Sequence, residues 1–142
     1  MRIKALTVCQ PHAWAIAAGY KPIENRPMFT TYRGPILIHA GKNRGWWAEG
    51  CRALWKCGIE APGHLRWGEL EGIAEVVDCV PVHQVRGRPF AWGPWCWIIE
   101  RPQRFDEGVP IRGRQGLFNV EIETLPAATA AIITQHIEGC RP

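Results

Sequence analysis

Glycine and proline divide this chain into short segments, and that division limits what the chain can fold into. The 142 residues include 15 glycines and 12 prolines. Proline lacks an amide donor and glycine favours turn conformations, so both residues interrupt helices and strands. The chain is therefore expected to form short elements, without the regular strand–helix–strand repeat of a doubly wound sheet.

Apolar, β-branched runs between these breakers predict the strands. They cover residues 3–8, 34–40, 72–82, 95–100 and 115–122. Residues 21–31 are expected to form a polar connection. The last two strands are expected to be separated by the breakers Pro102, Gly108, Pro110 and Gly113.

Helices are predicted in three places. Pro11 suits the first turn of a helix that ends at Gly19. Asn43 can cap a second helix, whose apolar residues recur up to Gly58, and residues 127–137 have helical character. Short strands interleaved with such helices favour an α+β fold, here a small β-barrel with short flanking helices.

Length and composition fit one folded domain over residues 1–142. Hydrophobic residues make up 46% and charged residues 21%, which excludes an intrinsically disordered chain. The six cysteines include no CxxC pair, so we interpret them as reduced thiols. No apolar leader opens the chain, and no segment approaches the ~20 apolar residues of a membrane span. We therefore expect a cytoplasmic protein with no membrane segment.

Polar residues are concentrated in the first third of the chain, at predicted strand ends and turns. The net charge of +4 permits a polyanionic partner. Amide side chains can read base edges, while arginine and lysine hold phosphates. The alternative is a surface ion network around Glu24. The candidate residues are Gln10, Lys21, Glu24, Asn25, Arg26, Tyr32, Arg33, His39 and Lys42.

Three ordered motifs in this region are similar to those of a known family. They are CQPHAWAI at residues 9–16, GYKPIENR at 19–26 and YRGPILIHA at 32–40. Two later segments, GIAEVVDC at 72–79 and PIRGRQGLF at 110–118, extend the similarity. Over residues 4–120 the chain resembles the ASCH (activating signal cointegrator homology) domain. It departs from the family pattern at His12, where a tryptophan is common.

The resemblance implies a PUA-like pseudo-barrel with a basic cleft that binds RNA, another single-stranded nucleic acid or a modified nucleoside. No cofactor and no metal are implied, and the oligomeric state stays open. In that cleft Lys21, Arg26, Arg33 and Lys42 would contact phosphates. Gln10, Glu24 and Asn25 would meet a base or sugar beside the His39 strand end, and Trp14 or Tyr32 would stack on a base.

The resemblance also leaves enzymatic alternatives open. A bacterial relative of the family is an amidohydrolase that removes acyl groups from N4 of cytidine. Lys21 matches its catalytic lysine, and Glu24 stands where that enzyme has a threonine nucleophile. Glu24 would then act as a general base and Lys21 would stabilise an oxyanion. A metal-dependent ribonuclease is a weaker alternative because the carboxylates are dispersed along the sequence.

Two further groups of residues have more than one possible role. Tryptophans cluster at residues 46–47 and 92–97, where they can fill a core, stack on bases or bind a protein partner. Arginines make the second half of the chain basic, either as a flank for a nucleic-acid backbone or as a solvated face. These are Arg86, Arg88, Arg101, Arg104, Arg112 and Arg114.

Overall fold

A computed structural model describes residues 1–140, which form an α+β fold as predicted. In that part of the chain six strands form one sheet, in the order β2-β5-β4-β3-β1-β6. The strands are β1 (Arg2–Val8), β2 (Ile23–Arg26), β3 (Gly34–Ala40), β4 (Glu69–Pro81), β5 (Trp95–Pro110) and β6 (Leu117–Glu121). The sheet is mixed because β1 pairs parallel to β3, while the other neighbours pair antiparallel.

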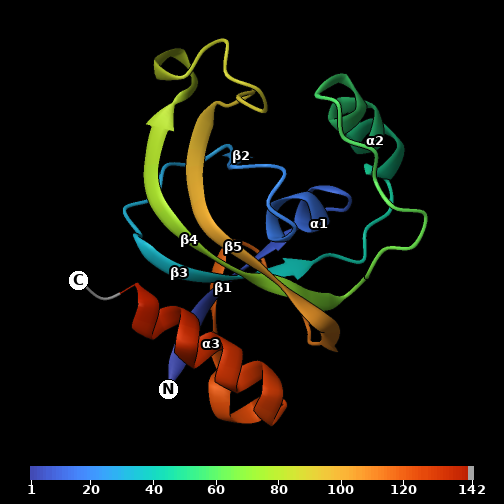
Figure 1. Cartoon of the computed structure of the whole chain (residues 1–142). Helices are drawn as coiled ribbons and strands as arrows, with labels where there is room; N and C mark the ends of the chain where they lie inside the picture. Colours follow the sequence, from blue (N-terminus) through green and yellow to red (C-terminus); the bar gives the residue numbers. More distant parts are fainter. Residues whose placement is uncertain (141–142) are drawn as a thin grey trace.

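Residues 1–140 also form three α-helices and two short 3-10 helices. They are α1 (His12–Ala17), α2 (Trp47–Lys56), α3 (Ala127–Gly139), η1 (Val82–Gln84) and η2 (Ile122–Thr124). The curved sheet wraps around α1, whereas α3 packs on its outer side (Figure 1). None of the helices in residues 1–140 is both long and apolar enough to pass through a membrane.

The sheet bends strongly along β4 and β5. Their register shifts three times, between Leu70 and Gly72, Ile73 and Glu75, and Val76 and Asp78. Such irregularities bend a strand and increase its twist. The two ends of the strand order, β2 and β6, are not paired with each other in the described part of the chain. The sheet is therefore curved like a barrel but is not closed by backbone hydrogen bonds.

Buried apolar residues occupy both sides of this sheet. Ile133 of α3 is fully buried and packs with Leu37 and Phe105 on the outer side. Ile16 of α1 packs with Ile38 and Trp97 on the inner side. A third group joins Trp14 to Leu54 of α2 and to Phe90 of the loop before β5. The sheet is thus a central layer with apolar packing on both faces.

Two predictions about the strands were wrong. Residues 23–26, predicted as a connection, form β2, because the buried Ile23 pairs opposite Ile98 of β5. The breakers Pro102 and Gly108 do not end a strand, since β5 continues to Pro110. Pro102 lies where the β4–β5 register shifts, next to Arg101 with φ 52°, and proline is tolerated at such a bulge.

The predicted cap of the second helix was also wrong. Helix α2 begins at Trp47, and no side chain caps its first turn. The Asn43 Oδ1 atom instead accepts a hydrogen bond from the amide of Gly45, at 2.8 Å. Asn43 therefore shapes the turn before the helix.

Candidate functional site

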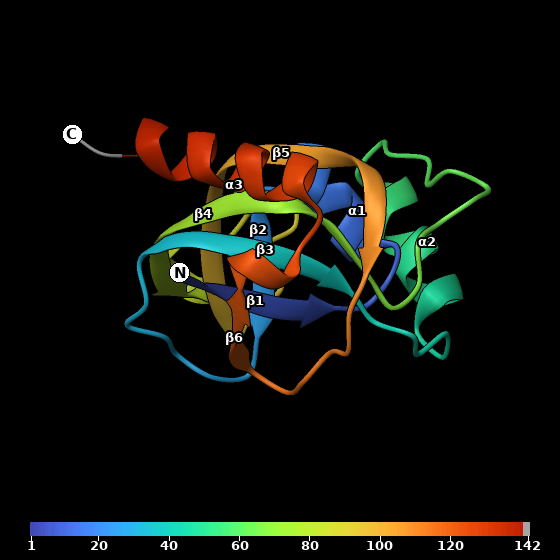
Figure 2. The ribbon, with the colours of Figure 1, turned by 90° about the horizontal axis from the view of Figure 1, so that it is seen from below.

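A wide cleft lies where the ends of β1 and β3 meet the loop between β5 and β6. The loop runs past these strand ends on its way to β6 (Figure 2). The cleft has a volume of about 1090 Å³. It is lined by Thr7, Arg26, His39, Gly41, Lys42, Trp67, Gly68, Glu69 and the whole segment from Pro110 to Gly116.

Positive charge dominates this cleft. Arg26, Lys42, Arg112 and Arg114 line it, and Glu69 is the one acidic residue among the lining residues of the described chain. Lys42, Arg112 and Arg114 are exposed to solvent. A concave surface with one sign of charge concentrates ions of the opposite sign, so the cleft attracts an anion.

The buried side chain of His39 forms the floor of the cleft. Its Nδ1 atom lies 3.0 Å from the Thr7 hydroxyl, and its Nε2 atom lies 3.0 Å from the carbonyl oxygen of Ile111. Burial lowers the pKa of His39 from its ordinary value, although the hydrogen bond to Ile111 acts in the opposite direction. His39 is therefore neutral near pH 7, with Nε2–H donating to Ile111 and Nδ1 accepting from Thr7.

The loop between β5 and β6 approaches this floor through Gly113. A Cβ atom at residue 113 would lie 2.6 Å from Cε1 of His39 and 2.8 Å from the Thr7 hydroxyl oxygen. Any larger residue would push the loop away from the strand ends. The close approach of this loop to the strand ends therefore depends on a glycine at this position.

Beside the cleft lies a buried ion cluster formed by Lys21, Glu24 and Arg26. Lys21 Nζ lies 3.2 Å from Glu24 Oε1, and Arg26 NH1 lies 3.2 Å from Glu24 Oε2. The side chains of Lys21 and Glu24 are only 2% and 7% exposed. Burial acts to raise the pKa of Glu24, but the charges of Lys21 and Arg26 outweigh it, so the pKa lies below its ordinary value. The cluster carries one excess positive charge, and Arg26 extends it into the cleft.

This arrangement is poorly suited to general-base catalysis. Both carboxylate oxygens of Glu24 are engaged by cations, and a carboxylate with a lowered pKa is a weak base. Lys21 Nζ also lies 5.4 Å from the centre of the Trp92 ring, which covers it. Within residues 1–140, no three histidine, cysteine or acidic side chains lie close enough together to hold a metal ion.

His12 lies next to this ion cluster. Its Nδ1 atom is buried and has no hydrogen-bond partner among the described residues. The ring packs edge-on against Trp92, with ring centres 5.8 Å apart. Burial, and then the charge of Lys21, lower the pKa of His12 from 6.5 to about 4. The folded protein therefore holds His12 neutral over a range of pH in which an unfolded chain protonates it.

The protein is expected to lose stability as the pH falls below 6.5, because His12 binds its proton more weakly in the folded state. The loss should reach about 2 kcal/mol in unfolding free energy between about pH 7.5 and about pH 5. His39 contributes with the same sign. Urea unfolding of the wild type and of His12→Gln at both pH values measures this loss of unfolding free energy.

His12→Gln should show a clearly smaller pH dependence than the wild type. A matched control is His64→Gln, which changes an exposed histidine of the loop before β4. An equal pH dependence in the wild type and His12→Gln would contradict the assignment to His12.

Two of the predicted base-contacting residues are engaged within the protein. Gln10 is fully buried, donates to Glu71 and to the carbonyl of Arg66, and accepts from the amide of Trp14. Asn25 donates to the carbonyl of Phe90 and accepts from the amides of Trp92 and Gly93. Their amide groups position the surrounding loops, which corrects the expectation that they face a ligand.

The other predicted residues are divided between the cleft and its surroundings. Arg26, His39 and Lys42 line the cleft. Trp14 is buried, and its ring packs against Tyr20 with centres 5.3 Å apart. Tyr32 and Arg33 precede β3, at the opposite end of that strand from His39. The Tyr32 hydroxyl donates to the carbonyl of Pro35, and Arg33 lies 3.5 Å from Asp78.

Several lining residues were not among the predicted site residues. Thr7, Trp67, Glu69 and Gln115 were missed, and Arg112 and Arg114 were noted only as members of a basic half. The segment PIRGRQGLF at residues 110–118 carried a signal, because it combines two arginines with two glycines in a connecting loop. Trp67 was indistinguishable in sequence from a core tryptophan.

Solved structures of ASCH proteins share this fold. One mutant of the ASCH protein from Zymomonas mobilis aligns with a TM-score of 0.55 at 12% identity, over 96% of each chain. A second mutant aligns with a TM-score of 0.54 at 13% identity, over 83% of this chain and 87% of that one. The unmutated protein gives a TM-score of 0.52 at 14% identity, over 96% of this chain and 94% of that one.

The fold is thus that of an ASCH-type α+β protein. The family model described as the ASCH domain matches residues 6–120, so the chain belongs to the ASCH domain family, as its motifs predicted. None of the curated proteins matches the sequence.

Proposed function

We propose that this protein binds single-stranded RNA, or a modified nucleotide, in the cleft between the ends of β1 and β3 and the β5–β6 loop. The observation that carries the proposal is the charge of the cleft. Four cationic side chains line it against one carboxylate. Exposed arginine and lysine neutralise phosphates and release counterions, which is the main source of affinity for nucleic acids.

The size and composition of the cleft support the same proposal. Its volume of about 1090 Å³ lies just above the roughly 300–1,000 Å³ typical of small-molecule pockets, so a nucleotide has room to bind. Gln115 adds a polar group, and Trp67 supplies an aromatic surface in the lining. Phosphate contacts would come from the rim, where Lys42, Arg112 and Arg114 are exposed.

Fluorescence anisotropy with a labelled single-stranded oligouridylate tests this proposal. With three or four phosphate contacts, log K should fall against log salt with a slope of about −2 to −3 between about 50 and about 200 mM salt. An equal affinity at both salt concentrations, or no binding at either, would contradict it. A DNA oligonucleotide of the same length reports whether the 2′-hydroxyl contributes.

The same protein is incubated with N4-acetylcytidine, and the products are separated by chromatography. If the protein binds nucleotides without hydrolysing them, the nucleoside should be recovered intact. Conversion to cytidine would instead support the amidohydrolase alternative, with Lys21 and Glu24 as its candidate catalytic residues.

A further inference from the structure

A second, smaller pocket adjoins the cleft and shares one wall with it. It is lined by Arg44, Trp47, Gly63, Leu65 and Trp67, and its volume is about 210 Å³. Trp67 also lines the large cleft. Trp67 is thus common to the linings of the two cavities, and Lys42 of the cleft lies two residues before Arg44 of the small pocket.

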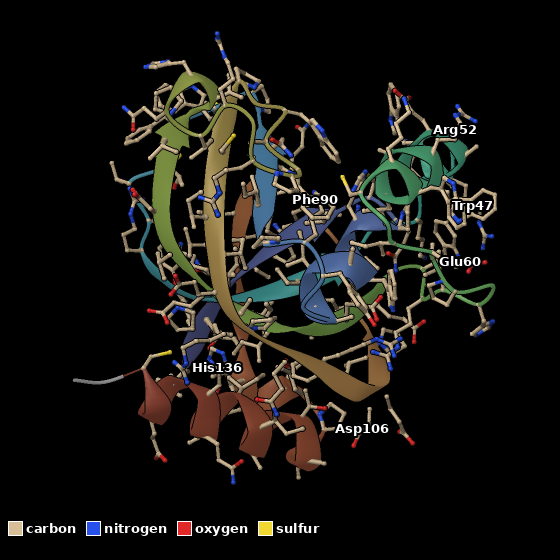
Figure 3. The ribbon with its side chains drawn as sticks, turned by 45° about the horizontal axis from the view of Figure 1, so that its top comes forward. Trp47, Arg52, Glu60, Phe90, Asp106 and His136 are labelled. Carbon is tan, nitrogen blue, oxygen red and sulfur yellow. The ribbon has the colours of Figure 1, made fainter. Side chains whose placement is uncertain are left out.

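Planar groups form two sides of this small pocket. The guanidinium carbon of Arg44 lies 4.2 Å from the centre of the Trp67 ring, so the two groups stack. Trp47 forms another side from the first turn of α2 and is 42% exposed. It lies on the outer side of that helix, away from the sheet (Figure 3). Gly63 adds no side chain that would fill the space between them.

The lining residues and the size of this pocket fit a nucleobase better than a whole nucleotide. Its volume lies below the roughly 300–1,000 Å³ of ordinary small-molecule pockets. Bases of single-stranded RNA stack on aromatic side chains and on arginine guanidinium planes, and both groups are present here. No acidic residue lines the small pocket in the described part of the chain.

We propose that the pocket between Trp47 and the stacked Arg44–Trp67 pair binds the base of a neighbouring nucleotide, so that the ligand is an oligonucleotide of at least two residues. This inference rests on the proposed function, because the first nucleotide occupies the large cleft. Lys42 and Arg44 then flank the phosphate that joins the two nucleotides. The exposed Trp47 serves as a stacking surface that the core does not need.

Isothermal titration calorimetry with uridine 5′-monophosphate and with the dinucleotide pUpU tests the second subsite. Stacking of one base should make pUpU bind about 5- to 150-fold more tightly than the mononucleotide. Trp47→Ala should remove this gain and leave the affinity for the mononucleotide unchanged. Trp55→Ala is the matched control, because Trp55 is on the same helix, is 66% exposed and lies outside both cavities.

A second variant separates stacking from charge. Arg44→Lys keeps the positive charge but loses the plane that stacks on Trp67. It should reduce the preference for pUpU, with the affinity for the mononucleotide unchanged. A full pUpU preference in Arg44→Lys would contradict the stacking role of Arg44.

The remaining outcomes distinguish this inference from the proposed function. Equal binding of pUpU and the mononucleotide by the wild type would overturn the second subsite and leave the large cleft as a nucleotide site. Loss of the pUpU preference in Trp55→Ala as well as in Trp47→Ala would also overturn it. Failure of the wild type to bind either ligand would overturn both proposals.

Discussion

Replacing Arg112 and Arg114 together by alanine is expected to weaken the binding of single-stranded RNA about a hundredfold at moderate salt. Each charge-assisted contact to a phosphate contributes about a factor of ten or more, and both side chains are exposed in the cleft. The salt slope should also become shallower by about 1.4, since each lost contact removes about 0.7. Anisotropy titrations over a range of salt concentrations measure both effects.

The matched control is the double variant Arg86→Ala with Arg88→Ala. It changes the net charge of the protein by the same amount, but both arginines are exposed outside the cleft. It should bind the RNA nearly as tightly as the wild type does. If both double variants lost affinity equally, attraction by the overall charge would explain the binding and the cleft would have no special role.

Replacing Lys21 by methionine is expected to lower the free energy of unfolding by about 3 kcal/mol. Methionine fills a similar volume but leaves the buried Glu24 carboxylate with Arg26 as its remaining cation. Breaking a buried ion pair on one side is costly because the remaining charge stays out of water. Urea denaturation of Lys21→Met and of the wild type measures the difference.

Lys56→Met is the control for this variant, because Lys56 is exposed at the end of α2. Such a surface change should alter the stability by less than about 0.5 kcal/mol. Adding Glu24→Leu to Lys21→Met should recover part of the loss, since the buried carboxylate is then gone. Equal stability of Lys21→Met and Lys56→Met would show that the buried pair does not hold this part of the fold.

The sequence predicted the elements that lie between two breakers better than the others. The strand at residues 34–40 and the helix before Gly19 agree closely with β3 and α1. Breakers bound these elements on both sides. The first part of β5 was predicted at residues 95–100, but its continuation to Pro110 was missed. Pro102 reads as a strand end, and the register shift that tolerates it depends on the partner strand.

Three of the fifteen residues that line the candidate site were predicted, because Arg26 and His39 belong to recognisable motifs and Lys42 follows the second of these closely. The rest of the lining depends on tertiary structure. Pairing of β1 with β3 brings Thr7 to His39, and the distant segment at residues 110–116 then covers them. A polar side chain at a strand end also looks the same in sequence whether it lines an open cleft, as Arg26 does, or is hydrogen-bonded within the protein, as Gln10 is.

The loop between β5 and β6 links two distant positions of the sheet. β5 is second in the strand order from one edge, whereas β6 is the opposite edge strand. The connection therefore acts as a covalent strap that holds the curled sheet where edge-to-edge hydrogen bonding does not. Because the strap is also a wall of the cleft, its length limits both how far the edges of the sheet can separate and how wide the cleft can be. A longer or shorter connection would therefore change the width of the cleft without repacking the core.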